Sequence, residues 1–323
     1  MVGGVNPINI VLFSEINSKF GYPFFRELMG DSRVNLLALV TSAPGKLCDY
    51  YLNESDIVDL ESEASSLGIP VYRPKTVNAP SLIQELKELC PDYFIIANYQ
   101  QILKQDLLDV PIQDTINFHP SPLPRYAGLA PFFWMARNGE RFGGVTALVT
   151  TVTIDGGPIL SQREILLGGT ETSLEIRDIH FHESLLLLKD VLPKLAQRKY
   201  ETYPQDLTKR TYFGHPKSAD YVIPWDSSQE EVLSIIRASS PDPGAITYVN
   251  GLHRFTVLEA ESCEAPNTPL QSPGSTILVQ EKLLVSTSDG WVEIKTIRNE
   301  EGPVNFRSIP YQFDSAEVSS IVS

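Results

Sequence analysis

Short apolar runs alternate with amphipathic segments along the first 120 residues of the chain. Runs rich in β-branched residues predict buried strands at residues 8–13, 34–41, 69–72, 92–97 and 115–118. Between them, apolar residues at helical spacing predict helices at 23–29, 56–67 and 79–89. Buried strands that alternate with helices are typical of an α/β fold. We therefore expect a doubly wound, mostly parallel sheet.

The pattern continues in a second group of elements up to residue 196. It predicts a helix at 129–138, a β-rich stretch at 144–153 and a strand at 159–167. Residues 173–196 have a long amphipathic pattern, which predicts a helix that is kinked or ended near Pro193. His180 and His182 on this helix are two residues apart and face different directions, so they make a poor metal pair and no metal site is expected.

A polar stretch without periodicity separates these elements from a β-rich C-terminal part. There, a helix is predicted at 228–238, with short strands at 245–249, 255–259, 275–279, 283–286 and 292–297. One helix and several short strands fit a small open barrel, with a polar, proline-rich surface loop at 261–273. The expected organisation is an N-terminal domain at 1–200, a linker at 201–212 and a C-terminal domain at 213–323.

Composition and charge narrow the class of protein. With 42% apolar and 20% charged residues, the 323-residue chain is ordinary for a soluble protein, and no run approaches the about 20 apolar residues that span a bilayer. Its start lacks the basic region of a signal peptide. Three widely spaced cysteines match neither a disulfide framework nor a zinc motif. These features predict a cytoplasmic protein with free thiols and no membrane partner.

The net charge of −14 disfavours a polyanionic partner. Residues 211–323 contain seven Lys and Arg against fifteen Asp and Glu, which is evidence against a tRNA-binding appendage.

Polar residues with catalytic potential follow the predicted strands. Ligands of a doubly wound sheet bind beyond the carboxyl ends of its strands. Asn117 and His119 stand at one such end, and a proline-punctuated loop follows them. Asp155 comes later, within an Ile-Asp-Gly-Gly turn. An amide, an imidazole and a carboxylate suit an acyl-transfer site, in which the amide can donate to an oxyanion and the imidazole can move a proton.

These residues also carry a resemblance to a known family. The pattern N-x-H-x-S-x-L-P-R-Y-x-G-x-A-P, followed some 35 residues later by D-x-G-x-I-L, resembles the folate-dependent formyltransferases. The resemblance implies a Rossmann-like catalytic domain, an OB-like C-terminal domain, and 10-formyltetrahydrofolate as co-substrate without a metal. It also assigns roles: Asn117 as oxyanion donor, His119 as general base or electrostatic stabiliser, and Asp155 as the group that orients His119. Which of His119 and Asp155 takes the amine proton stays open.

The resemblance further implies binding residues. The folate is expected against two segments, largely through backbone contacts, with these residues: Tyr99, Gln100, Gln101, Ile102, Leu103, Ile154 and Gly156. The alternative for 99–103 is a plain strand-to-helix connection. Ser121, Arg125 and Tyr126 are expected to shape the acceptor site. Arg125 could meet a phosphate or the folate glutamate, and a surface salt bridge is its alternative.

The acceptor amine is less well defined than the family. Methionyl-tRNA formyltransferases carry a basic insertion after the second strand, whereas residues 42–63 here contain one lysine and six acidic residues. The runs RTYFGHPKSADYVIPWD and IRASSPDPGAITYVNGLHRFTV resemble UDP-4-amino-4-deoxy-arabinose formyltransferase. A nucleotide-linked amino sugar is therefore the favoured acceptor. However, residues 14–18 depart from the shorter, glycine-containing turn of relatives.

Three alternatives remain for the reaction. The acceptor could be hydroxyornithine or an amino acid in secondary metabolism, or methionyl-tRNA in spite of the charge. Outside the transferases, a formyl-folate hydrolase would pass the group to water, although such enzymes usually add an N-terminal domain and lack this C-terminal one. The acidic C-terminal domain could serve packing, contact in a homodimer, or one wall of a small-ligand site.

Overall fold

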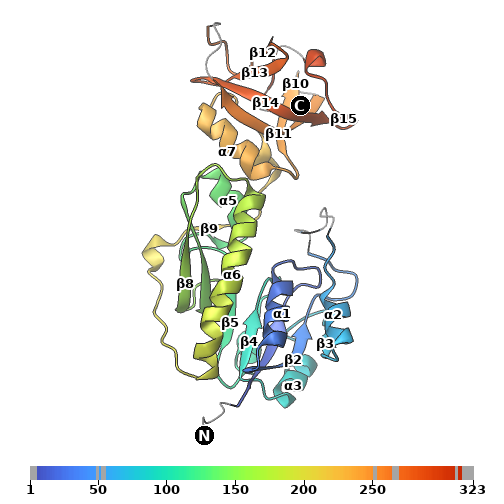
Figure 1. The fold of residues 1–323 in the computed structure, drawn as a ribbon, viewed down its shortest axis with the longest axis vertical. Coiled ribbons are helices and arrows are strands. Elements are labelled where there is room, and N and C mark those ends of the chain that lie inside the picture. Colours follow the sequence, from blue (N-terminus) through green and yellow to red (C-terminus); the bar gives the residue numbers. More distant parts are fainter. Residues whose placement is uncertain are drawn as a thin grey trace, which may run out of the picture. The chain divides into compact units, whose positions relative to one another are not determined.

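A computed structural model describes residues 6–48, 51, 56–249, 253–263, 269–309 and 312–314. The chain forms two compact units, which we describe separately (Figure 1). The N-terminal unit comprises the described residues of Met1–Gly128, Gly143–Ile165 and Ile179–Tyr212. The C-terminal unit comprises those of Leu129–Phe142, Leu166–Asp178 and Phe213–Ser323. Outside the described ranges lie the first five and the last nine residues of the chain. Parts of the acidic segment 42–63 and of the predicted loop 261–273 are also outside them.

The N-terminal unit is built on a sheet that has seven strands within the described residues, in the order β3-β2-β1-β4-β5-β7-β8. The first five strands pair in parallel, and β7 pairs antiparallel with β5. The prediction of a mostly parallel α/β sheet is therefore confirmed. The strands are β1 (Ile8–Phe13), β2 (Val34–Val40), β3 (Val71–Tyr72), β4 (Tyr93–Ile96), β5 (Thr115–His119), β7 (Phe142–Val149) and β8 (Ile159–Leu166).

Helices connect these strands and cover the sheet (Figure 1). They are α1 (Gly21–Gly30), α2 (Leu60–Ser66), α3 (Pro80–Glu88), α4 (Gln105–Leu108) and α6 (Ser173–Ala196). Each packs through an apolar stripe; on α3, for example, Leu82 and Leu86 join Val11 and Phe94 of the sheet in one core cluster. Because the faces of the sheet are covered in this way, its edges and strand ends are the places where polar groups can meet a ligand.

Helix boundaries differ from the predictions where a single polar contact sets them. α2 begins at Leu60, later than the predicted residue 56, because the Asp59 side chain caps it by accepting from the Ser62 backbone N–H. α6 does not end at Pro193 but continues to Ala196.

The C-terminal unit pairs two helices with an antiparallel sheet in the order β10-β11-β14-β13-β12, with β15 paired to β14. Its elements are α5 (Pro131–Arg137), α7 (Gln229–Ser239), β10 (Ala245–Val249), β11 (His253–Cys263), β12 (Thr276–Val279), β13 (Lys282–Ser286), β14 (Trp291–Asn299) and β15 (Gly302–Pro303). A β-rich C-terminal part is therefore confirmed, whereas closure into an OB-like barrel stays a prediction. β6 (Ala127–Gly128) pairs with β9 (Tyr212–Phe213), and short 3₁₀ turns lie at Leu207–Lys209, Ser218–Tyr221 and Phe306–Ser308.

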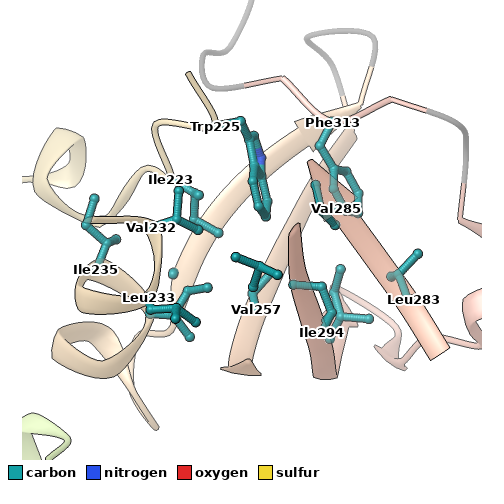
Figure 2. Close-up of a cluster of buried hydrophobic side chains, with 14 of the residues drawn as sticks. Ile223, Trp225, Val232, Leu233, Ile235, Val257, Leu283, Val285, Ile294 and Phe313 are labelled. Carbon is teal, nitrogen blue, oxygen red and sulfur yellow. The ribbon is translucent and has the colours of Figure 1, made fainter. Parts of the chain in front are cut away.

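The core of the C-terminal unit lies between α7 and this sheet (Figure 2). Trp225 and Phe313 stack with ring centroids 5.7 Å apart, and Val257 and Ile294 come from neighbouring strands. The Trp225 indole N–H donates to Thr247 Oγ1 at 2.8 Å, so the largest buried side chain also satisfies its polar atom. In the part of the chain that the structure describes, no helix has the length and apolarity to cross a membrane.

Candidate functional site

The carboxyl edge of the parallel strands carries the polar residues singled out from the sequence. Asn117 and His119 are two residues apart on β5, so their side chains share one face of the sheet. β7 pairs antiparallel with β5, with Thr146 opposite His119, and its turn into β8 returns Asp155 to this edge. The structure therefore brings Asp155 beside His119 from a segment far away in the chain, and Asn117 lies on the same face of β5 as His119.

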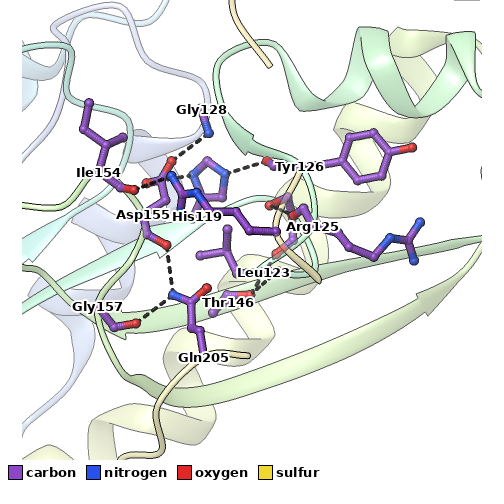
Figure 3. A network of polar contacts seen from close by, with 12 residues as sticks. His119, Leu123, Arg125, Tyr126, Gly128, Thr146, Ile154, Asp155, Gly157 and Gln205 are labelled. Atoms are coloured by element: carbon purple, nitrogen blue, oxygen red, sulfur yellow. Dashed lines mark hydrogen bonds and ion pairs between the residues drawn. The ribbon is translucent and has the colours of Figure 1, made fainter. Parts of the chain in front are cut away.

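His119 is held by two different partners, one at each ring nitrogen (Figure 3). Nε2 lies 3.2 Å from the Tyr126 carbonyl oxygen, and Nδ1 lies 3.6 Å from Asp155 Oδ1. Both partners are hydrogen-bond acceptors, since a carbonyl and an ionised carboxylate can only accept. The contact at Nε2 is within hydrogen-bonding distance and the contact at Nδ1 is longer, so in the neutral ring the geometry favours the proton on Nε2. Nδ1 then faces a carboxylate that can stabilise a proton taken up there.

Asp155 is fixed by its backbone and by one of its oxygens. It has a φ of 50° in the left-handed region, which is uncommon for a residue other than glycine. Its Oδ2 accepts from the Gly128 N–H at 2.8 Å, which leaves Oδ1 toward His119. The turn also needs Gly157, since a Cβ there would lie 1.8 Å from the Val149 carbonyl oxygen. The side chains of His119 and Asp155 are each only 10% exposed, so solvent screens the electrostatic interaction between them less than it would at the surface.

Thr146 forms hydrogen bonds with the proline loop, residues 120–126, that follows His119. Its hydroxyl donates to the Ser121 carbonyl at 2.8 Å and accepts from the Leu123 N–H at 3.3 Å. Gln162 adds a side-chain N–H to the same hydroxyl at 2.8 Å. The Leu123–Pro124 peptide bond within this loop is cis. These contacts define the path of the chain up to Tyr126, whose carbonyl meets His119.

Asn117 has a half-buried side chain on the same face as His119. Among the described residues, no hydrogen-bond partner is recorded for its amide. The neighbouring positions on the adjacent strands are the apolar Ile96 and Leu148. An amide N–H that is partly buried and unengaged can donate to an oxygen brought in by a ligand.

The side chains of residues 99–103 are divided between the protein interior and solvent. The Tyr99 ring packs edge-on against Phe13 at 5.6 Å. The Gln101 side chain accepts from the Val77 N–H at 2.8 Å, whereas Leu103 is buried and Ile102 is 62% exposed. Gln100 is exposed as well, so backbone atoms and the side chains of Gln100 and Ile102 are accessible in this loop. Its contact with a folate stays a prediction.

A buried polar atom without a partner also lies at this edge. In the described part of the chain, Asn98 Oδ1, next to the end of β4, is buried without a hydrogen-bond partner. Thr150 Oγ1 is likewise unpartnered, but Thr150 follows the antiparallel strand β7 and its N–H donates to the Thr115 carbonyl at the opposite end of β5. Ile154, beside Asp155, is 44% exposed. An apolar surface with inward-facing polar acceptors is the usual composition of a small-molecule site.

Glu15 is a buried carboxylate that holds the loop after β4. It is 3% exposed, its N–H donates to the Asn98 carbonyl at 2.8 Å, and its Oε1 accepts from the Gln100 N–H at 2.9 Å. Burial raises the pKa of Glu15 above its usual 4.5, and this outweighs the opposing effects of Gln100, Ser42 and Lys46. Glu15 thereby joins the loops that follow β1 and β4.

A Glu15→Gln variant is expected to be less pH-dependent in stability than the wild type. Because the pKa of Glu15 is raised in the folded state, folded protein keeps a proton that unfolded protein releases. The contribution of Glu15 to wild-type stability therefore falls as pH rises from 4.5 through its folded pKa. Glutamine keeps the oxygen that accepts from Gln100 but does not titrate. Urea unfolding of both proteins across this range measures the difference, and equal pH slopes would contradict the expectation.

The three residues expected to shape the acceptor site are engaged mainly with one another and with the fold. Ser121 is fully buried and donates its hydroxyl to the Arg125 carbonyl at 3.1 Å. Tyr126 is 3% exposed, and the Arg125 guanidinium lies 5.5 Å from the centre of its ring. The structure thus gives Ser121 and Tyr126 a part in the conformation of the loop, and their contact with an acceptor stays a prediction.

Several residues of the site were not singled out from the sequence. Gly128 stands in the quoted motif, but its N–H contact with Asp155 was not foreseen. Gln205 donates to the carbonyl oxygens of Asp155 and Gly157 at 2.8 and 2.7 Å (Figure 3). It lies in a polar stretch without periodicity, so no local pattern marks it.

Known proteins match the chain over both units. Residues 9–191 match the family model described as formyl transferase, and residues 216–305 match that of the formyl transferase C-terminal domain. The methionyl-tRNA formyltransferase of Ruminiclostridium cellulolyticum is 32% identical over 232 residues, which are 72% of this chain and 74% of that protein.

Solved structures share the fold at low sequence identity. The N-formyltransferase from Helicobacter canadensis, in complex with folinic acid and dTDP-3-aminofucose, has a TM-score of 0.67 and 17% identity, covering 90% of this chain and 99% of that one. WlaRD, a sugar 3N-formyltransferase crystallised with dTDP and 5-N-formyl-THF, has a TM-score of 0.66 and 16% identity, covering 92% and 98%.

Proposed function

The chain belongs to the formyltransferase family, and from this premise we propose that it transfers the formyl group of 10-formyltetrahydrofolate to the primary amine of a nucleotide-linked amino sugar. As a member of this family it is an enzyme, an N-formyltransferase. The observation that carries the proposal is the setting of His119, with Nε2 tied to the Tyr126 carbonyl and Nδ1 facing Asp155.

In the proposed reaction, three residues have separate roles: His119, Asp155 and Asn117. As the amine attacks, His119 takes up the departing proton at Nδ1, where Asp155 Oδ1 stabilises the imidazolium that forms. The Tyr126 carbonyl keeps Nε2 protonated throughout, so Nδ1 is the nitrogen that exchanges the proton. Asn117 donates its amide N–H to the oxygen that becomes anionic. His119 then returns the proton to the leaving nitrogen.

The residues at the sheet edge fit a folate. When bound, 10-formyltetrahydrofolate supplies the formyl carbon and the leaving nitrogen. A pterin ring has polar N–H groups around a flat face, and the unpartnered Asn98 Oδ1 is an acceptor for such a group. The exposed side chains of Ile102 and Ile154 offer apolar surface to the ring faces. We propose that these residues, with the backbone of 99–103 and of Gly156, hold the folate.

Two kinds of relative point to different acceptors. The Helicobacter canadensis neighbour binds dTDP-3-aminofucose, and the acidic C-terminal part of this chain favours such a small molecule over a polyanion. The 32% identical relative acts on methionyl-tRNA, which supports tRNA as the second candidate. We propose the amino sugar because a net charge of −14 would repel a tRNA backbone.

Organisation and location follow from the same observations. We propose a catalytic domain at 1–200, a connecting segment at 201–212 and an accessory domain at 213–323, which the two matched ranges 9–191 and 216–305 support. None of the three cysteines, all of which the structure describes, is in a disulfide; this suits a reducing compartment, and the cytoplasm is the proposed location. A homodimer is one arrangement that the accessory domain could serve.

A panel of amines tests the proposed reaction. Purified protein is mixed with 10-formyltetrahydrofolate and with UDP- or dTDP-linked 4-amino and 3-amino sugars, hydroxyornithine, or initiator methionyl-tRNA, and tetrahydrofolate release is followed. We expect release with a sugar nucleotide, and none when Asp155→Ala replaces the wild type. Tetrahydrofolate release only with the tRNA would contradict the amino sugar as acceptor. Tetrahydrofolate release without any amine would indicate a hydrolase.

A further inference from the structure

We propose that the segment 205–211 is a positioning element for His119, and that Gln205 is its principal residue. This inference rests on the proposed function, in which His119 exchanges the proton. It follows from one observation: the two residues that His119 contacts, Asp155 and Tyr126, both have backbone groups that are hydrogen-bonded to this single segment.

The first anchor is on the Asp155 turn. One Gln205 side-chain nitrogen donates to the carbonyl oxygens of Asp155 and Gly157 at 2.8 and 2.7 Å (Figure 3). Arg210 donates to the preceding carbonyl, that of Ile154, at 2.8 Å. These bonds hold three successive parts of a turn in which Asp155 has a left-handed φ of 50°. A residue kept in that region needs its surroundings to hold it there.

The second anchor is on the proline loop. The Thr211 hydroxyl accepts from the Tyr126 N–H at 2.8 Å, and the Thr211 N–H donates to the Pro124 carbonyl at 3.2 Å. The Thr211 carbonyl accepts from the Ala127 N–H at 3.0 Å. Tyr126 also has a left-handed φ, of 56°. Its peptide groups are therefore fixed on both sides, which sets the direction of the carbonyl that meets His119 Nε2.

Burial distinguishes these anchors from their neighbours. Residues 201–204 and 206–209 are exposed, whereas Gln205 and Arg210 are half-buried. Each keeps one buried polar atom, Gln205 Oε1 or Arg210 Nη1, without a partner among the described residues. The other polar atoms of these two side chains reach the turn that carries Asp155, where they donate to the Asp155 and Ile154 carbonyls.

We expect the segment 205–211 to influence which nitrogen of the His119 imidazole carries the proton. If Gln205 no longer holds the Asp155 turn, Asp155 and His119 lose their alignment, and Nδ1 and Nε2 compete for the proton. Gln205 does not need to touch either substrate for this effect. It would change the rate of proton transfer.

Gln205→Met removes the two donated hydrogen bonds at nearly constant size. Gln113, which is exposed on the same unit, provides the matched control Gln113→Met. Thr211→Val removes the acceptor for the Tyr126 N–H and tests the second anchor independently of the first. All proteins are used at full length. A cooperative thermal unfolding transition, measured on a separate sample of each, first establishes that they are folded.

Imidazole ¹⁵N chemical shifts provide a readout that needs no acceptor. In the wild type we expect the His119 signals of a single neutral form, with the proton on Nε2. In Gln205→Met and Thr211→Val we expect the two nitrogen shifts to approach one another, because both tautomers are populated. With an amine that the wild type formylates, kcat is expected to fall about tenfold.

The outcomes separate this inference from the proposed function. Unchanged His119 shifts in both variants would overturn the inference, whatever the amines show. Equal changes in Gln113→Met would also overturn it. Altered shifts confined to Gln205→Met and Thr211→Val, together with a silent panel of amines, would support the positioning element while counting against the proposed reaction.

Discussion

Replacing His119 by glutamine is expected to lower the kcat of formyl transfer by about 10²–10⁴-fold, the usual contribution of a positioned general acid or base. The glutamine amide can still donate to the Tyr126 carbonyl, which lies 3.2 Å from His119 Nε2 in the wild type. It cannot, however, accept a proton on the side that faces Asp155. The loss should therefore appear in kcat, with KM for the folate little changed, in steady-state measurements of tetrahydrofolate release.

A second histidine supplies the control for this measurement. His182 is exposed on α6, and His182→Gln changes the same functional group away from the site. We expect wild-type rates from it. A His119→Gln enzyme that keeps more than a tenth of the wild-type kcat would contradict the assignment of His119 as the proton carrier.

Replacing Asn117 by alanine is expected to lower kcat by about 10²–10³-fold, the typical loss when one oxyanion donor is removed. The Asn117 amide has no recorded hydrogen-bond partner among the described residues, so its removal should leave the resting fold intact. The effect should therefore be confined to the transition state, in which the formyl oxygen carries negative charge. The ratio of the two kcat values at saturating folate and amine measures it.

A change of charge at the same position sharpens the test. Asn117→Asp has nearly the same shape but places a carboxylate where the oxyanion develops, so it should be slower than Asn117→Ala. Asn35→Ala, exposed on β2 of the same sheet, is the matched control and should retain full activity. An Asn117→Asp enzyme faster than Asn117→Ala would show that this amide does not donate to an oxyanion.

Local apolar patterns were sufficient to predict most elements of the N-terminal unit. Residues 8–13 were predicted as a strand and form β1, because a short β-branched run between polar residues can be buried on both faces of a parallel sheet. Differences arise where another part of the chain supplies the contacts. β11 continues to Cys263, beyond the predicted residue 259, since its polar outer part pairs with β14 over Glu261–Cys263.

The candidate site was predictable only in part. The Asn-x-His spacing places both side chains on one face of any strand, so their proximity follows from the sequence. The position of Asp155 beside His119 depends on how β7 pairs with β5 and on the turn that follows, and was expected from the family resemblance alone. Gln205, fifty residues from Asp155, lies in a stretch without periodicity and gave no signal.

The sequence by itself therefore determined the order of strands and helices, the α/β character of the N-terminal unit and the residue types at its strand ends. Each of these depends on apolar spacing over a few neighbouring residues. Only the tertiary structure decided which groups meet the two ring nitrogens of His119, the Tyr126 carbonyl at Nε2 and the Asp155 carboxylate at Nδ1. Their directions are set by left-handed backbone at Tyr126 and Asp155 and by hydrogen bonds from distant segments, which side-chain identity does not encode.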